Sequence, residues 1–186
     1  MVKHIKHFIE QSWLLMTSAV FFGLLLAVTN AAWRPRIIQN EINKFNNLAG
    51  AMLKEATNFE VVETIQVDTG KGRMVETEIK KGVNADGQCL GWAFVCQGSG
   101  FADKIKLVLT VDKAFEKLGG YGVLSSNETP GFGDKIKNTY YRSQFVGAPA
   151  TELTISKIGD DKIIDSDIVA ISGATVSSEA VVTILN

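Results

Sequence analysis

The first third of the chain opens with a long run of apolar residues that carries no charge. Residues 12–33 contain no Asp, Glu, Lys or Arg, and Trp13 and Trp33 stand at the two ends. A helix of about 20 apolar residues spans a bilayer core of ~30 Å, and tryptophans concentrate at the membrane interfaces. A signal peptide has a shorter apolar region, about 7–15 residues, and a small-residue cleavage site that is not evident here. The pattern therefore predicts a transmembrane anchor over 12–33, after an N-terminal segment 1–11.

The charges on the two flanks of this run leave its orientation open. Lys3 and Lys6 favour a cytoplasmic N-terminus, whereas Arg34 and Arg36 on the other flank weaken that bias.

A helical period follows the run and predicts a linker helix in segment 34–57. The apolar positions that recur at helical spacing are Ile38, Ile42, Phe45, Ala49, Met52 and Leu53. Two interpretations remain open for this face, packing on the following domain or docking against neighbouring membrane subunits.

From residue 58 onward the pattern changes to short apolar runs separated by turn residues. Strands are predicted over 59–67, 90–96, 104–111, 153–156 and 162–164, and the alternation over 104–111 predicts a half-buried strand. Residues 113–118 are expected to form a short helix that Gly119 and Gly120 end, and Lys80-Lys81 is interpreted as a solvated turn. Several strands with few long helices predict an α+β domain with a largely antiparallel sheet over 58–186.

Composition excludes several functions. The net charge of -1 and the pI near 6.1 give no indication of nucleic-acid binding. Both histidines, His4 and His7, precede the anchor, so no histidine-based catalytic residue or metal site is expected in the domain. Cys89 and Cys96 would lie ~23 Å apart along one strand, whereas a disulfide needs Cα atoms about 5.5–6 Å apart, so two separate thiols are expected.

Near the C-terminus, small residues and hydroxyl side chains occur together. Residues 168–171 read as a buried strand, Ser172-Gly173-Ala174 as a tight turn, and a helix is predicted to begin near Thr175. The free N–H groups and positive dipole end of a helix N-terminus favour a phosphate. A turn that only caps the last helix is the structural alternative. A loop with Glu128-Thr129-Pro130-Gly131-Phe132-Gly133 lies upstream.

These two segments resemble the FMN-binding domain family. Ser172-Gly173-Ala174-Thr175, followed by the pair Ser177-Ser178, resembles the family's flavinylation motif, and segment 128–133 resembles its Glu-Thr-Pro-Gly-Leu-Gly segment. The family includes the G subunit of the Rnf electron-transport complex and the C subunit of the sodium-pumping NADH:quinone reductase. The length of this chain favours the first of these. The family's motif begins with an Asp at the position of Val169, and Asp167 precedes it by two residues.

The resemblance implies an electron-carrying subunit of an ion-translocating complex, with no substrate turnover of its own. It implies FMN bound covalently, as a phosphoester to Thr175 that a separate flavin transferase makes, in a domain on the extracytoplasmic side of the cytoplasmic membrane. The implied partners are integral membrane subunits, a flavin- or iron–sulfur-bearing subunit and the lipid bilayer, with no nucleic acid. The residues implied to bind the cofactor are Thr175, Ser172, Gly173, Ala174, Val176, Ser177, Glu128, Thr129 and Gly131. A membrane-anchored domain that binds a ligand or partner without redox activity remains the alternative.

Overall fold

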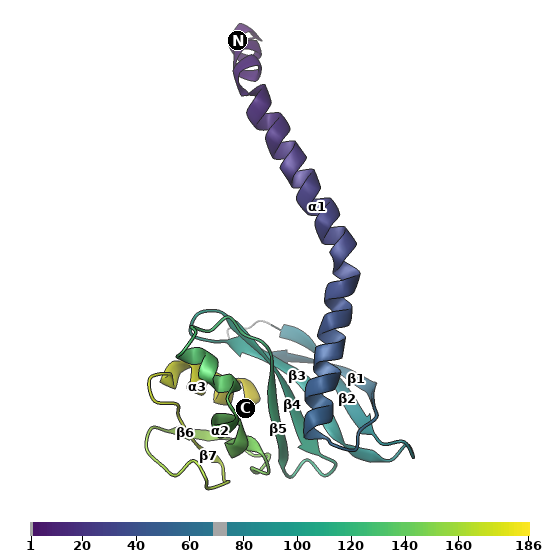
Figure 1. Cartoon of the computed structure of the whole chain (residues 1–186), viewed down its shortest axis with the longest axis vertical. Coiled ribbons are helices and arrows are strands. Elements are labelled where there is room, and N and C mark those ends of the chain that lie inside the picture. The colour runs from purple at the N-terminus through teal and green to yellow at the C-terminus, as the bar shows by residue number, and fades with distance from the viewer. Residues whose placement is uncertain (1, 69–73) are drawn as a thin grey trace. The chain divides into compact units, whose positions relative to one another are not determined.

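The computed structural model of the chain describes the backbone of residues 2–68 and 74–186 and the side chains of 11–67 and 74–186 (Figure 1). The chain divides into two units, Met1–Ile42 and Asn43–Asn186. In sequence order, one long helix, a five-stranded sheet, three short helical segments, two short strands and a last helix follow one another.

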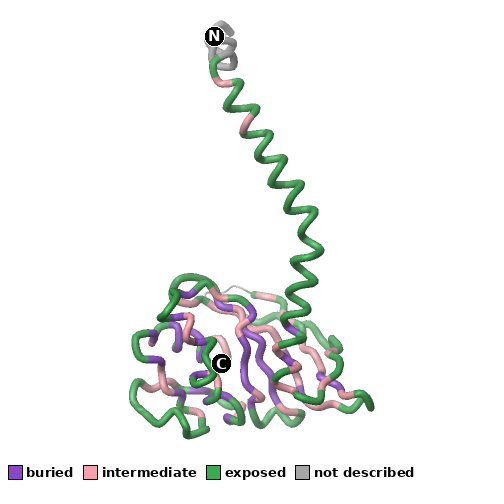
Figure 2. The backbone as a smooth tube through the Cα atoms, viewed as in Figure 1, coloured by how far each residue is buried: buried purple, intermediate pink, exposed green. Residues whose placement is uncertain are grey.

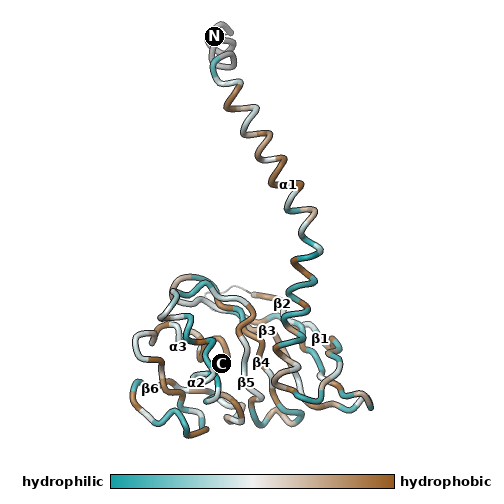
Figure 3. The backbone as a smooth tube through the Cα atoms, in the orientation of Figure 1, coloured by the Kyte–Doolittle hydropathy of each residue, from teal (hydrophilic) through white to brown (hydrophobic). Residues whose placement is uncertain are grey.

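The first unit lies within helix α1 (Val2–Met52). Its stretch from Gln11 has a mean hydropathy of 1.9 in its most apolar window, and none of that window is buried in protein (Figure 3). Within the described residues, α1 is the one helix long and apolar enough to cross a membrane. The hydroxyls of Thr17, Ser18 and Thr29 donate to helix carbonyls three or four residues earlier, which satisfies them without water.

The helix expected over 34–57 is the continuation of this same helix and ends at Met52. Pro35 lies inside α1, where it removes one backbone donor but leaves the hydrogen bonds on either side available. The chain leaves the helix through a turn in which the Ala56 N–H donates to the Leu53 carbonyl at 2.9 Å.

The second unit is built on an antiparallel sheet with strand order β1-β2-β3-β4-β5. Its strands are β1 (Asn58–Asp68), β2 (Met74–Val83), β3 (Cys89–Ser99), β4 (Lys104–Asp112) and β5 (Leu118–Ser125). The α+β class and the largely antiparallel sheet are therefore confirmed, as are the strands expected near 59–67, 90–96 and 104–111. Cys89 and Cys96 are both free.

Strand β4 is buried on both faces rather than half-buried as its alternation predicted (Figure 2). On one face, Leu107, Leu109 and Val111 belong to the larger core. On the other, Val108 packs with Phe45 and Ala49 of the C-terminal end of α1 in a second core. The expectation of a solvated face was wrong because the helix that covers it lies about 60 residues earlier in the sequence.

Two expected local structures were also wrong. Residues 113–117 form the turn between β4 and β5 instead of a helix, because Asp112 Oδ1 accepts the N–H groups of Glu116 and Lys117 at 2.8 and 3.2 Å. The pair Lys80-Lys81 lies inside β2, where the Lys80 ammonium sits 4.5 Å from the centre of the Phe45 ring.

The chain after β5 covers the face of the sheet opposite the C-terminal end of α1, where Phe45 and Ala49 lie. It comprises η1 (Gly133–Lys137), α2 (Thr139–Arg142), η2 (Ser143–Phe145), β6 (Thr154–Ser156), β7 (Asp167–Val169) and α3 (Thr175–Leu185). Strand β6 pairs in parallel with β7, and the strand expected over 162–164 is absent from the described structure.

Two tyrosines join these helical segments to the sheet and to α3. Tyr121, Tyr141 and Phe145 are fully buried and meet edge to face, with ring centres 4.9–6.5 Å apart. The Tyr121 hydroxyl donates to the Ile136 carbonyl at 2.6 Å, and the Tyr141 hydroxyl donates to the Ser178 carbonyl at 3.0 Å. Burial raises the pKa of both phenols, so both stay neutral and can donate at physiological pH.

Replacing Tyr141 with Phe removes this donor and is expected to lower the free energy of unfolding by about 1–3 kcal/mol, because the lost bond is buried. Tyr140→Phe is the matched control, since the Tyr140 side chain is next in sequence and is 46% exposed. Denaturant unfolding of the full chain in detergent measures both. Equal stability of the two variants would contradict the structural role of the Tyr141 hydroxyl.

Candidate functional site

The tight turn before α3 contains a residue with positive φ, and a glycine stands at that position. The Ala174 N–H donates to the Ile171 carbonyl at 2.9 Å, and Gly173 between them has a φ of 78°, a backbone angle that favours glycine. Helix α3 then begins at Thr175, as the sequence predicted. Its N-cap is Ala174, which offers no side-chain acceptor to the first-turn N–H groups.

Ser178 holds this turn against the helix from inside. Its hydroxyl is fully buried, accepts from the Ile171 N–H and donates to the Ala174 carbonyl, both at 3.0 Å. The Ser178 side chain therefore joins the two ends of the turn, and Tyr141 binds its carbonyl from the other side. The sequence singled out the Ser-Ser pair, but it did not distinguish this structural serine from its neighbour.

Ser177 points toward a different partner, the carboxylate of Glu128. Its hydroxyl donates to Glu128 Oε2 at 2.5 Å, and the other carboxylate oxygen, Oε1, accepts the Ala102 N–H at 3.0 Å. Glu128 is only 4% exposed and Ser177 only 3%. One buried carboxylate therefore connects the loop after β5, the hairpin between β3 and β4, and the first turn of α3.

Two glycines leave room for this carboxylate. A Cβ on Gly100 would lie 2.4 Å from Glu128 Oε1, and a Cβ on Gly133 would lie 2.5 Å from Ser177 Oγ and 2.7 Å from Glu128 Oε2. Gly100 lies in the hairpin turn between β3 and β4, where its N–H donates to the Asp103 carbonyl at 2.8 Å. The close approach of the carboxylate to it was not foreseen.

A second hydrogen bond holds the same hairpin to the loop that carries Glu128. The Asn127 amide donates to Asp103 Oδ2 at 2.9 Å, and the Lys104 N–H donates to Asp103 Oδ1 at 2.7 Å. These two donors lower the pKa of the Asp103 carboxyl, so it stays ionised near neutral pH.

A cavity of about 390 Å³ opens where these three segments meet. Its lining comprises Phe101, Glu128, Thr129, Phe132, Gly133, Gly173, Ala174, Thr175, Val176 and Ser177. Seven of the nine residues expected at the site line it. Phe101 is an addition that the sequence did not single out as a site residue, and no local signal distinguished it from a turn residue.

The cavity combines two kinds of surface. Phe101, Phe132 and Val176 are 68%, 58% and 52% exposed, which is unusual for large apolar side chains that surround one opening. The Thr175 hydroxyl makes no hydrogen bond within the described part of the chain, and it lies in the uncapped first turn of α3. The site can therefore receive an anion at the helix N-terminus and a flat apolar group against the aromatic rim.

Two residues expected at the site, Ser172 and Gly131, do not line this cavity. Ser172 is exposed in the turn before α3. Gly131 is exposed in a turn in which the Phe132 N–H donates to the Thr129 carbonyl at 3.2 Å, and its φ is 79°. Each of these two residues therefore contributes to a turn. In the second turn, Pro130 and Gly131 occupy the two central positions, where proline and a glycine of positive φ are favoured.

Val169, at the position of the family's Asp, also lies outside the cavity lining. It ends β7, and its backbone exchanges two hydrogen bonds with the buried Gln144 amide, at 2.8 and 3.2 Å. Asp167 accepts from the Thr154 hydroxyl at 3.1 Å and is exposed.

Comparison with known proteins agrees with this geometry. A family model described as "FMN-binding domain" matches residues 100–186, which include all the lining residues of the cavity. The chain is 30% identical over 174 residues to the G subunit of an ion-translocating oxidoreductase complex from Methanosarcina acetivorans, covering 93% of this chain and 87% of that protein. It is 30% identical over 171 residues to the G subunit of the Na(+)-translocating ferredoxin:NAD(+) oxidoreductase complex of Acetobacterium woodii, covering 87% and 80%.

A solved structure has the same fold at lower sequence similarity. It is the C subunit of the Na(+)-translocating NADH-quinone reductase from Parabacteroides distasonis, with a TM-score of 0.56 and 18% identity, over 81% of this chain and 90% of that one. The family model, the coverage of both G subunits and the common fold agree, and the chain belongs to the FMN-binding domain family, together with the G subunits of ion-translocating oxidoreductase complexes.

Proposed function

We propose that this chain is a single-pass, membrane-anchored electron-carrying subunit of an ion-translocating Rnf-type oxidoreductase complex, with FMN held covalently at Thr175. The observation that carries the proposal is the meeting of the motif around Thr175 with the Glu128 loop at one cavity, where Ser177 bonds Glu128 from 49 residues away in sequence. Membership of the family and the long apolar helix α1 support the membrane complex.

The cavity fits the two ends of FMN. The uncapped N-terminus of α3 suits the phosphate, and the free Thr175 hydroxyl is the atom that a phosphoester would use. Phe101, Phe132 and Val176 would offer apolar surfaces to the isoalloxazine ring. The flavin supplies the redox chemistry when bound, while the protein binds, orients and shields it.

The buried Glu128 carboxylate has a positioning role in this proposal. Through Ser177 it holds the first turn of α3, and through the Ala102 N–H it holds the hairpin that carries Phe101. The two walls of the cavity are therefore kept at a set separation by one side chain. Fixing a redox group in position matters because the electron must pass between centres at a constant distance.

On this proposal, the domain from about residue 58 lies on the extracytoplasmic side, and the covalent bond prevents loss of FMN there. A separate flavin transferase makes the bond, and the electron partners are membrane subunits and a flavin- or iron–sulfur-bearing subunit of the same complex. A domain that binds a ligand or partner without redox activity is the second candidate, and Val169 at the position of the motif's Asp favours it.

The first prediction concerns Thr175→Ala, produced in cells that contain a flavin transferase. The wild-type band should fluoresce under ultraviolet light after denaturing electrophoresis, and the variant band should be dark, because the ester oxygen is gone. Thr183→Ala is the matched control, a threonine of the same helix that lies outside this cavity and should stay fluorescent. A bright Thr175→Ala band would place the linkage elsewhere, and a dark wild-type band with no flavin in the native protein would favour the second candidate.

The second prediction concerns Gly133→Ala, whose Cβ would press on Ser177 Oγ and on Glu128 Oε2. The hydrogen bond between these two groups should be lost, and the first turn of α3 should no longer be held in place. Covalent flavin should therefore fall about tenfold, which corresponds to a free-energy difference of about 1.4 kcal/mol. Gly50→Ala is the control, since its Cβ meets no atom within 4 Å. Flavin content per protein, read from visible absorbance, measures both, and normal loading of Gly133→Ala would contradict the positioning role of Glu128.

A further inference from the structure

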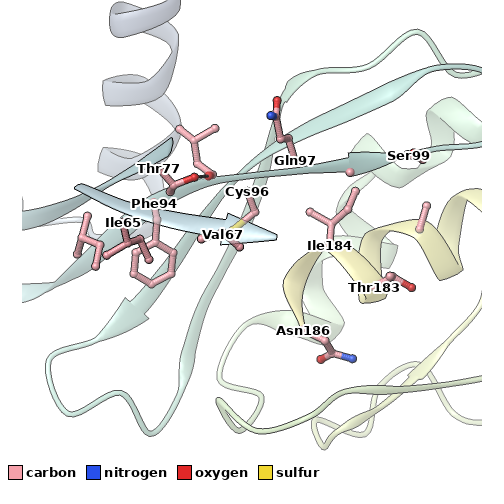
Figure 4. A pocket seen from close by; sticks show the side chains of 14 residues that line it. Ile65, Val67, Thr77, Phe94, Cys96, Gln97, Ser99, Thr183, Ile184 and Asn186 are labelled. Carbon is pink, nitrogen blue, oxygen red and sulfur yellow. Dashed lines mark hydrogen bonds between the residues drawn. The ribbon is translucent and has the colours of Figure 1, made fainter. Parts of the chain in front are cut away.

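A second cavity, of about 540 Å³, lies between the sheet and the C-terminal end of α3 (Figure 4). Strand β1 contributes Ile65 and Val67, β3 contributes Phe94 and Cys96, and α3 contributes Thr183 and Ile184. This cavity shares no lining residue with the site at Thr175. Its volume is in the range of small-molecule sites, about 300–1,000 Å³.

Among the residues that the structure describes, those that line the cavity carry no charged side chain. None of its residues is Asp, Glu, Lys, Arg or His. Burial raises the pKa of the Cys96 thiol to about 11, so this group is also neutral at physiological pH. An ionic ligand would lose its hydration here without gaining a side chain of opposite charge from the described lining, which is unfavourable. A neutral apolar molecule has no such cost.

Part of the apolar surface of the cavity is exposed in the described part of the chain. Ile65 and Val67 are 36% and 40% exposed although they face other apolar side chains across the opening (Figure 4). The Ile184 side chain packs directly on the Gly98 backbone, so closely that a Cβ on Gly98 would lie 2.5 Å from Ile184 Cγ1, and this contact sets the distance between the end of α3 and the sheet. The space is therefore a consequence of tight packing at Gly98, and a bound apolar group is what would fill it.

A few polar groups stand beside this apolar surface. The Thr183 hydroxyl makes no hydrogen bond within the described part of the chain, whereas the Thr77 hydroxyl donates to the Val95 carbonyl at 3.2 Å. Apolar walls with a small number of polar groups are the usual composition of a site for an organic molecule.

We propose that this cavity binds an uncharged, mostly apolar small molecule that has one or two carbonyl or hydroxyl groups, independently of flavin binding at Thr175. The Thr183 hydroxyl is the group that would orient its polar end.

The test uses the full chain in detergent micelles, labelled with ¹³C at the isoleucine δ1 methyl groups, and titrated with 2-naphthol. Methyl signals of Ile65, Ile79 and Ile184, which line the cavity, should shift and saturate. Ile136, fully buried in the larger core, and Ile158, 91% exposed, are the references and should not follow the same curve. 2-Naphthalenesulfonate has the same ring with a negative charge and should give no saturable shift.

Two variants fill the cavity from opposite walls. Ile65→Trp and Thr183→Trp should each weaken 2-naphthol binding roughly tenfold or more, because the bulky ring takes the ligand's place. Val61→Trp is the matched control on β1, since Val61 is 55% exposed and does not line the cavity. An unchanged Ile136 signal shows that each variant keeps its core.

Three results would overturn the proposal. They are the absence of a saturable shift at the three lining methyls, an equal response to the sulfonate, and unchanged binding in both filled variants. The result does not depend on flavin, because the same titration is run on the Thr175→Ala protein and should give the same curve. Failure of this titration therefore leaves the fluorescence test at Thr175 unaffected.

Discussion

The hydrogen bond between Ser177 and Glu128 is the interaction on which the geometry of the candidate site depends. A carboxylate that is 4% exposed costs free energy unless its oxygens are hydrogen-bonded, and here each oxygen has a donor. These donors come from α3 and from the β3–β4 hairpin. Separating the segments would leave a buried carboxylate without hydrogen-bond donors, which is unfavourable in free energy. The three segments are therefore held together more firmly than by apolar contact alone.

The adjacent serines Ser177 and Ser178 have different structural roles. Ser177 faces the cavity and joins α3 to Glu128, whereas Ser178 faces the core and joins the two ends of the turn that presents Thr175. Consecutive helix residues lie about 100° apart around the axis, so two adjacent serines serve two different faces. The small residues before them are equally constrained, since Gly173 adopts a φ of 78° that other residues reach only with strain.

Local pattern predicted most of the strands and the start of α3, because alternation and turn residues act within a few positions. It failed where distant parts of the chain decide the outcome. Strand β4 reads as half-buried, and only the packing of Phe45 and Ala49 on its far face buries it completely. The failure at 113–117 has a local cause instead, because the Asp112 carboxylate accepts the N–H groups of Glu116 and Lys117 and holds a turn where the residues suit a helix. The same distinction applies to the candidate site. Seven of nine expected residues line one cavity, because motif and loop were identified by resemblance to a family and a family preserves its geometry. Phe101 was missed because its place at the rim depends on how the β3–β4 hairpin folds back onto Glu128.

Helix α3 has a separate environment at each end and a core contact between them. Its first turn forms the wall of the cavity at Thr175, Val181 is fully buried, and Ile184 borders the apolar cavity. The distance from Ser177 to Ile184 along the helix is about 10 Å, at 1.5 Å per residue. Because Gly98 fixes the C-terminal end against β3 and Ser178 fixes the N-terminal end against its turn, the helix is held at both ends. A substitution at one cavity therefore acts on the other only if it displaces the whole helix, which the buried Val181 opposes.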